Sequence, residues 1–404
     1  MDGNQGSRGA PSRGRVAIPR TVWVLGFVSL CMDMSSEIIH ALLPLFLTGT
    51  LGASVAMVGL IDGVAESTAS IARVFSGYLS DRIGRRKPLI LMGYGLAALS
   101  KPLFPLAGSA AVVLGARFAD RIGKGLRGAP RDALVADVTP QHIRGRAYGL
   151  RQSLDTIGAF VGPLLAIALM YVFADDMRTV FWIAVVPALG AVVLVLAGVE
   201  DRARDAGTVD AEAPIHARDV TRLGRGFWGV VAIGVVFTLA RFSEAFLILR
   251  ATGEGLPLAL APLVLVVMNI VYGLGAYPAG ALADSLGARG LLLSGVATLI
   301  ASDLLLALAP GLVGAFLGIT LWGAHMALTQ GVLAKLVAEH APPKLVGSAF
   351  GLFNLATGAA LLAASLAAGW IWDRFSPEAT FLAGAGFALA AGLMLLAWRA
   401  LARP

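Results

Sequence analysis

The feature that most constrains this chain is a series of long apolar runs separated by short polar gaps. A helix needs about 20 apolar residues to cross the hydrocarbon core of a membrane, and most of these runs have that length. They are too long for strands and lack the period of two that a membrane barrel requires. We therefore predict an all-α integral membrane fold of twelve transmembrane helices, at residues 21–47, 57–80, 89–107, 110–134, 147–170, 179–198, 226–249, 258–281, 290–309, 312–338, 347–370 and 380–399.

The composition excludes several classes of protein. Of the 404 residues, 57% are hydrophobic and 14% are charged, whereas about 25% are charged in a soluble domain. The gaps are too short to hold a catalytic domain, so we do not expect an enzyme. The sequence has no Walker-type phosphate loop, one cysteine and five scattered histidines, which predicts no cofactor and no metal site. The alternative is a divalent metal at His40, with carboxylates from Asp33, Glu37, Asp62 and Glu66.

The net charge of +7 marks topology rather than nucleic-acid binding. Clusters of Arg and Lys precede the first predicted span, follow the second and fourth, fill the segment after the sixth and close the chain. All of these clusters lie on the same side of the membrane as the two termini if both termini share a side. Basic residues accumulate on the cytoplasmic side of membrane proteins. We expect a protein of the bacterial inner membrane with both termini in the cytoplasm.

Two pairs of matching segments indicate an internal repeat. Residues 77–86 and 280–289 both fit G-x-x-x-D-x-x-G-x-R, and about 200 residues separate them. Residues 139–149 and 341–351 match each other at nearly the same offset. We predict two related halves of six spans each and a cytoplasmic linker between them, with bounds 1–198, 226–404 and 199–225.

These segments resemble the signature loops of the major facilitator superfamily. The loop between helices 2 and 3 of that family is matched by Gly77, Asp81, Gly84, Arg85 and Arg86, and its weaker second copy by Gly280, Asp284, Gly287 and Arg289. The resemblance implies two six-helix bundles, a central cavity and alternating access. It also implies a cytoplasmic gate, in which Asp81 caps helix 11 and an Arg of the loop pairs with Asp137 or Asp132 of helix 4.

Charged residues inside the predicted spans recur at helical spacing and therefore share one face of each helix. A charge at the centre of a span costs about 2.5–3.5 kcal/mol on insertion scales, so such a face must contact protein or water. The first half holds most of them: Asp33, Glu37, His40, Asp62, Glu66, Arg73, Arg117, Asp120, Arg121, Lys124, Arg127, Arg131, Asp132, Arg151 and Asp155. The second half has fewer: Arg241, Glu244, His325 and Lys335. Because acids and bases nearly balance, structural ion pairs are the alternative to a functional polar interior.

Asp33 is the leading candidate for proton coupling. It lies well inside the first span, with Glu37 and His40 one and two turns further along. A buried carboxyl group favours its protonated form and His titrates near neutral pH, so this face can carry protons. Glu66 and Arg121 complete the candidate coupling set. We expect substrate contacts at Arg117, Lys124, Arg241 and Asn269.

Two further segments resemble motifs of proton-coupled exporters in the same family. Arg121 begins a stretch similar to the R-x-x-Q-G-x-G-A pattern of helix 4, with Lys124 in place of the Gln and Arg127 in place of a Gly. The fifth span carries Gly158, Gly162 and Pro163, similar to the antiporter motif G-x-x-x-G-P. The Gly-Gly that completes that motif is missing.

These features predict a monomeric secondary transporter that exports a small solute in exchange for protons. The main alternative is proton-linked uptake of an organic anion, which the basic face of the fourth span favours. A membrane sensor built on a transporter fold is a third possibility. It is disfavoured because a sensor does not need so many charges inside the membrane.

Overall fold

The computed structural model describes residues 17–83, 85–200, 223–342 and 345–398, and within them every regular element is a helix. The helices are α1 (Arg20–Leu45), η1 (Phe46–Thr50), α2 (Val55–Ile83), α3 (Lys87–Ser100), α4 (Leu103–Leu106), α5 (Ala110–Val138), η2 (Gln141–Ile143), α6 (Arg144–Val172), α7 (Met177–Gly198), α9 (Arg225–Leu239), α10 (Ala245–Gly253), η3 (Leu258–Leu260), α11 (Leu263–Leu308), α12 (Gly311–His340), α13 (Val346–Arg374) and α14 (Pro377–Ala397). Helices satisfy their own backbone hydrogen bonds, which is what lipid requires of a spanning segment.

Ten helical stretches of the described residues are long and apolar enough to cross a membrane. The predicted spans 110–134 and 226–249 are not among them. The first corresponds to α5, whose many charged residues lower its hydropathy. The second is divided into α9 and α10 by residues 240–244, which we call the unwound segment, so the prediction of one continuous helix there is wrong.

The long helix α11 contains two predicted spans, 258–281 and 290–309. They are separated at Gly287, where φ is 68° and ψ is 162° and the helix is interrupted. A positive φ of this kind favours glycine, because any other side chain would clash with the backbone. The kink confirms that the chain turns between these spans.

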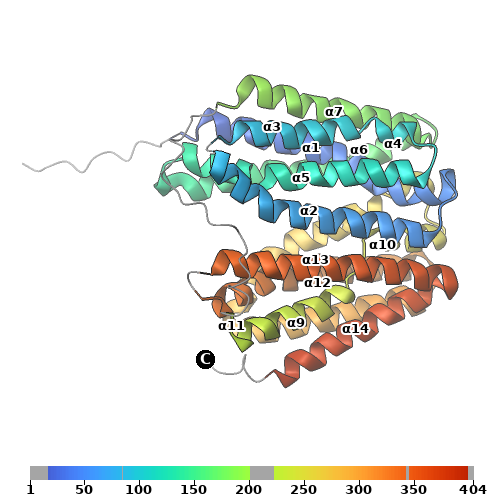
Figure 1. The fold of residues 1–404 in the computed structure, drawn as a ribbon. Helices are drawn as coiled ribbons and strands as arrows, with labels where there is room; N and C mark the ends of the chain where they lie inside the picture. Colours follow the sequence, from blue (N-terminus) through green and yellow to red (C-terminus); the bar gives the residue numbers. More distant parts are fainter. Residues whose placement is uncertain (1–16, 84, 201–222, 343–344, 399–404) are drawn as a thin grey trace, which may run out of the picture.

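The helices form two groups, which we name by chain position. The N-half comprises the helices up to α7 and the C-half those from α9 onward, and Figure 1 shows the two groups lying against each other. In the N-half, α1 packs on α6 and α7, and α5 packs on α2 and α3. In the C-half, α11 packs on α12 and α14, and α9 packs on α13 and α14. The halves meet chiefly along α2 and α13.

One end of the molecule joins the halves through a helix cap. We call the end at which α1 finishes and α2 begins the distal end, and the end at which α1 begins the proximal end. The N–H groups of Val55 and Ala56, at the start of α2, donate to the carboxylate of Asp373 at 3.1 and 2.8 Å. Because Asp373 lies near the end of α13, a carboxylate of the C-half caps a helix of the N-half.

Glycines bring α2 and α13 close together near this end. A Cβ added at Gly59 would lie 2.1 Å from the carbonyl oxygen of Ser365, and one added at Gly369 would lie 2.6 Å from the Cα of Ala56. Toward the middle, a Cβ at Gly358 would be 3.6 Å from the nearest atom of α2. The two helices diverge toward the proximal end, as Figure 1 shows.

The hydrophobic core follows the same division. A large cluster of buried side chains joins Ile38 in the distal part of α1 and Phe46 of η1 to C-half residues such as Phe246. The proximal part of the N-half, including Val22 and Tyr94, forms a separate cluster. Burial of apolar area therefore holds the two halves together mainly at the distal end.

We predict that Gly59→Ala weakens this contact. The added methyl group would overlap the backbone of α13, and overpacking of this kind costs about 1–3 kcal/mol of unfolding free energy. The matched control is Gly95→Ala in α3, where an added Cβ meets no atom within 4 Å. Thermal unfolding of both variants in detergent measures the difference. Equal midpoints would show that the approach of α2 to α13 does not depend on a glycine.

Candidate functional site

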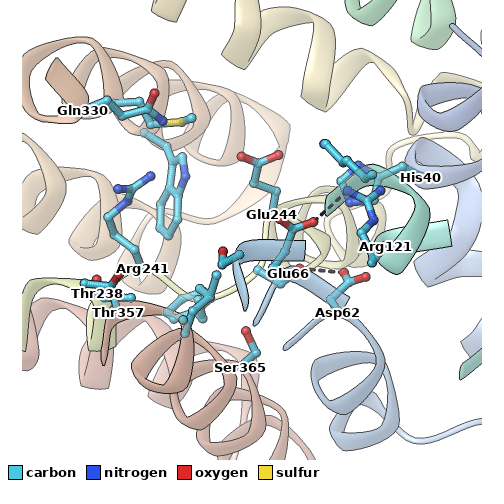
Figure 2. A pocket seen from close by; sticks show the side chains of 18 of the residues that line it. His40, Asp62, Glu66, Arg121, Thr238, Arg241, Glu244, Gln330, Thr357 and Ser365 are labelled. Atoms are coloured by element: carbon cyan, nitrogen blue, oxygen red, sulfur yellow. Dashed lines mark hydrogen bonds and ion pairs between the residues drawn. The ribbon is translucent and has the colours of Figure 1, made fainter. Parts of the chain in front are cut away.

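A polar cavity of about 450 Å³ lies between the two halves. The N-half lines it mainly from α1, α2 and α5, and the C-half from the unwound segment, α11, α12 and α13. Figure 2 shows Glu66 and Arg121 on one side of the cavity and Arg241 on the other. The predicted site residues that line it are Glu37, His40, Glu66, Arg121, Lys124, Arg241 and Asn269.

The unwound segment brings polar groups of the C-half into the cavity. Local hydrogen bonds hold its turns: the Arg241 N–H donates to the Thr238 carbonyl at 3.0 Å, and the Ala245 N–H donates to the Ser243 hydroxyl at 3.1 Å. Non-helical backbone at membrane depth is tolerated where it lines a cavity or is buried in protein. Here the break presents Arg241, Ser243 and Glu244 to the cavity.

Ion pairs order the N-half wall. The Arg121 Nη1 atom lies 3.1 Å from the Glu66 Oε1 atom, and the His40 Nδ1 atom lies 3.5 Å from the Glu37 Oε2 atom. The Arg121–Glu66 pair compensates two charges that would be costly in an apolar environment. Within the described residues, no group of three or more His, Cys, Asp or Glu side chains is arranged to hold a metal ion.

Asp62 connects the two halves inside the cavity. Its Oδ1 atom lies 3.4 Å from the Arg117 Nη2 atom, and its Oδ2 atom accepts a hydrogen bond from the Ser243 hydroxyl at 2.7 Å. Arg117 is only 2% exposed and is not among the residues that line the cavity. The structure therefore places Arg117 behind Asp62 rather than at the substrate surface where we expected it.

Three charged side chains face the cavity without an ion-pair partner among the described residues: Lys124, Arg241 and Glu244. An aromatic surface lies beside them, where the rings of Phe242 and Trp322 are 5.5 Å apart. The cavity thus offers charges of both signs next to apolar rings. Such a lining suits a small solute that has both polar and apolar parts.

Asp33 lies outside the cavity lining, one turn proximal to Glu37 on α1. Its carboxyl group lies beside the Asp155 carboxyl group on α6. An Asp155 oxygen lies 3.5 Å from the Arg151 Nη1 atom and 3.7 Å from the Arg131 Nη1 atom. A series of ionisable groups therefore continues from the cavity toward the proximal end.

Comparison with known proteins decides the family. The family model of the Major Facilitator Superfamily matches residues 25–357 and 245–404. The chain belongs to the major facilitator superfamily. It is therefore a multi-pass membrane transporter of small molecules and not an enzyme.

Individual relatives agree with this assignment. An uncharacterised MFS-type transporter of Methanocaldococcus jannaschii is 30% identical over 393 residues, which are 94% of this chain and 95% of that protein. The multidrug resistance protein MdtH of Yersinia enterocolitica is 31% identical over 169 residues, 42% of this chain and 40% of that protein. The crystal structure of the nucleoside transporter NupG is similar in fold, with a TM-score of 0.77 at 12% identity, and the match covers 93% of this chain and 98% of that one.

The glycines of the fifth predicted span pack α6 of the transporter against α1. A Cβ at Gly158 would lie 2.4 Å from the Leu30 carbonyl oxygen, and one at Gly162 would lie 2.7 Å from the Glu37 Cβ. Pro163 follows within the same helix. The motif therefore sets how closely α6 approaches Glu37, which lines the cavity.

The loop between α2 and α3 supplies one of the expected gate contacts. The Arg86 Nε atom lies 3.5 Å from the Asp137 Oδ2 atom at the end of α5, and Arg86 also donates to the Ser80 hydroxyl. Arg85 is exposed. Gly84 lies outside the described residues. Of Gly77, Asp81 and Asp284, only the helical backbone is described.

The structure also describes the contacts of Asp132 and Arg289, two further residues of the predicted gate. Asp132, the alternative acid, lies 3.3 Å from the Arg131 Nε atom and 3.7 Å from the Arg151 Nε atom, so it belongs with the charges near Asp155. In the second copy of the loop, Arg289 donates to the Leu396 carbonyl at 2.7 Å, near the end of α14.

The role of Lys101, which follows α3, was not predicted from the sequence. Its Nζ atom lies 2.9 Å from the Asp120 Oδ1 atom of α5 and 2.9 Å from the Ser36 hydroxyl of α1. Lys101 is 1% exposed and Asp120 is 2% exposed. This buried ion pair joins three helices of the N-half. The only signal in the sequence was a Lys at a predicted span end, where snorkelling to the interface is the usual explanation.

We predict that Lys101→Met destabilises the transporter by about 3–5 kcal/mol, because it leaves the Asp120 carboxylate buried with one fewer partner. Adding Asp120→Asn to this variant should recover part of the loss. Thermal unfolding in detergent provides the measurement. The control is Lys335→Met, which removes an exposed pair with Glu339 at 3.9 Å and should change little. If Lys101→Met unfolds at the same temperature as the unmodified protein, this pair is not important for stability.

Proposed function

We propose that this transporter exports a small solute in exchange for protons by alternating access. The observation that carries the proposal is a cavity lined by Glu37, His40 and Glu66 between two halves that are held together at the distal end. A cavity that is closed at one end by contacts able to break is what alternating access requires.

In this proposal the chain has twelve transmembrane helices, with α5 and the pair α9–α10 added to the ten apolar ones. Residues 1–198 and 226–404 form two six-helix bundles, and residues 199–225 form a cytoplasmic linker. The positive-inside bias supports cytoplasmic termini in a bacterial inner membrane, so the proximal end faces the cytoplasm. The protein functions as a monomer, because a single chain supplies both walls of the cavity.

Proton coupling is assigned to Asp33, Glu37, His40, Glu66 and Arg121. Glu37 and Glu66 face the cavity, where a solute and a proton can compete for them. The proximity of Asp33 and Asp155 supports a path from the cavity toward the proximal end.

Export is supported by two observations. The chain resembles the multidrug resistance protein MdtH over part of its length. Gly162 of the antiporter-like motif packs directly beside Glu37. The second candidate, proton-linked uptake of an organic anion, is favoured by Lys124 and Arg241, which face the cavity without an ion-pair partner among the described residues.

The decisive experiment uses proteoliposomes with an imposed pH gradient and a panel of small solutes. Export predicts solute movement opposite to the protons, and uptake predicts movement with them. We expect Asp33→Asn to abolish the dependence on the gradient while solute exchange without a gradient continues. Asp175→Asn, in the exposed turn between α6 and α7, is the control and should behave as the unmodified protein. Gradient-driven transport that survives Asp33→Asn would remove Asp33 from the coupling set.

The distal contact gives a separate prediction about the conformational equilibrium. Asp373→Ala removes the cap of α2, and a cap worth about 1 kcal/mol shifts a two-state population about fivefold. Ser70 of α2 lines the cavity. We expect faster labelling of a Ser70→Cys variant, made in a Cys31→Ser background, by an impermeant thiol reagent applied from outside the cell.

The control for this prediction is Asp176→Ala. Asp176 accepts a hydrogen bond from the Arg178 N–H at 3.0 Å and caps α7 within the N-half alone. Its removal should leave the labelling rate unchanged. Equal rates for Asp373→Ala and Asp176→Ala would contradict a role for Asp373 in holding the distal end closed.

A further inference from the structure

Asp303 is a buried acid without a hydrogen-bond partner. It lies on the second part of α11, is 0% exposed, and neither of its carboxylate oxygens has a partner among the described residues. A Cβ added at Gly384 of α14 would lie 2.8 Å from the Asp303 Oδ2 atom and 3.0 Å from the ring of Phe242. The carboxyl group therefore lies beside α14 and close to Phe242 of the unwound segment.

Charged residues at the distal end of the C-half are engaged elsewhere. Arg250 of α10 donates to the Leu306 carbonyl at 2.8 Å, one turn from Asp303. The same guanidinium pairs with Glu378 of α14 at 2.8 Å and with Glu254 at 2.9 Å. All three nitrogens of its guanidinium group are engaged, so this cation does not serve as a counter-charge for Asp303.

Among the described residues, the remaining ionisable groups of this region form no pair with Asp303. On α12, His325 is fully buried and its ring lies edge-on to Trp322, with centroids 5.3 Å apart. Arg241 and Glu244 line the cavity. Within the described residues, none of these side chains forms a hydrogen bond or ion pair with Asp303. A negative charge on Asp303 would thus have neither a partner nor water.

We propose that Asp303 is a second proton-binding site of the transporter, located in the C-half and covered by Phe242. The inference rests on the proposed proton coupling and extends it to an acid outside the N-half. An isolated carboxyl group in an apolar enclosure holds a proton rather than a charge. When the enclosure opens, the O–H bond breaks, the proton passes to a water molecule of the cavity, and the carboxylate remains.

The unwound segment connects this site to the solute. Phe242 lies in the cavity wall, between Arg241 on one side and Ser243 and Glu244 on the other. A solute that binds these polar neighbours displaces the short segment and the Phe242 ring with it. One five-residue break in a helix thereby senses the solute and controls the access of water to Asp303.

Infrared difference spectroscopy tests the protonation state directly. The sample is the purified full-length transporter in lipid nanodiscs at pH 7, without added solute. We expect the unmodified protein to show a carbonyl band of a protonated carboxylic acid that Asp303→Asn lacks. Because Asn resembles the neutral acid, the thermal unfolding midpoint should not change. A spectrum without this difference, or a large fall in the midpoint with no band lost, would overturn the proposal.

Hydrogen exchange tests the covering role of Phe242. After transfer to D₂O, the acid band should shift slowly in the unmodified protein and about tenfold faster in Phe242→Ala, because exchange follows the frequency of local opening. Phe118→Ala, which changes an exposed ring on α5, is the control and should leave the rate unchanged. Equal rates in the two variants would exclude Phe242 as the cover.

The pH-gradient assay in proteoliposomes separates this inference from the proposed function. We expect Asp303→Asn to move fewer protons per solute than the unmodified protein. If the ratio is unchanged, Asp303 is a structural acid and the inference fails, although proton coupling stands. If the unmodified protein itself transports independently of the gradient, proton coupling fails.

Discussion

The structure depends on one constraint, the high free energy of an unpaired charge within a membrane-spanning protein. The N-half meets it with ion pairs that cross from helix to helix, such as Lys101–Asp120 and Arg117–Asp62. Each pair fixes the rotation of two helices, because both side chains must face the same point. Charge compensation and helix packing therefore depend on each other, because a change in one alters the other.

Close contact between helices is the second determinant, and small residues decide where it occurs. Gly158 and Gly162 hold α6 against α1 inside the N-half, whereas Gly59 and Gly369 hold α2 against α13 between the halves. Contacts within a half involve many helices, whereas the contact between halves is concentrated at the distal end. This difference supports a mechanism in which each half moves as a rigid body and the distal contact between the halves separates.

The unwound segment links these two features. Its backbone leaves the helical path and places Ser243 against Asp62 of the other half, so part of the C-half wall is held by an N-half acid. The adjacent Phe242 lies near a buried acid that no ion pair compensates. Polar contact, aromatic packing and proton storage thus meet within a few residues, and a solute in the cavity would contact them together.

The sequence alone determined most of the architecture and part of the site. Span length and helical spacing are local properties, so they predicted the membrane helices and the polar faces that carry Glu37, Glu66 and Arg121 into the cavity. Side-chain partners depend on how helices rotate and cross, which no local pattern records. Only the tertiary structure could pair Lys101 with Asp120 or place Arg117 behind Asp62. The break at 240–244 contains neither Gly nor Pro, and it forms where a cavity between the halves can accept its exposed backbone and polar side chains.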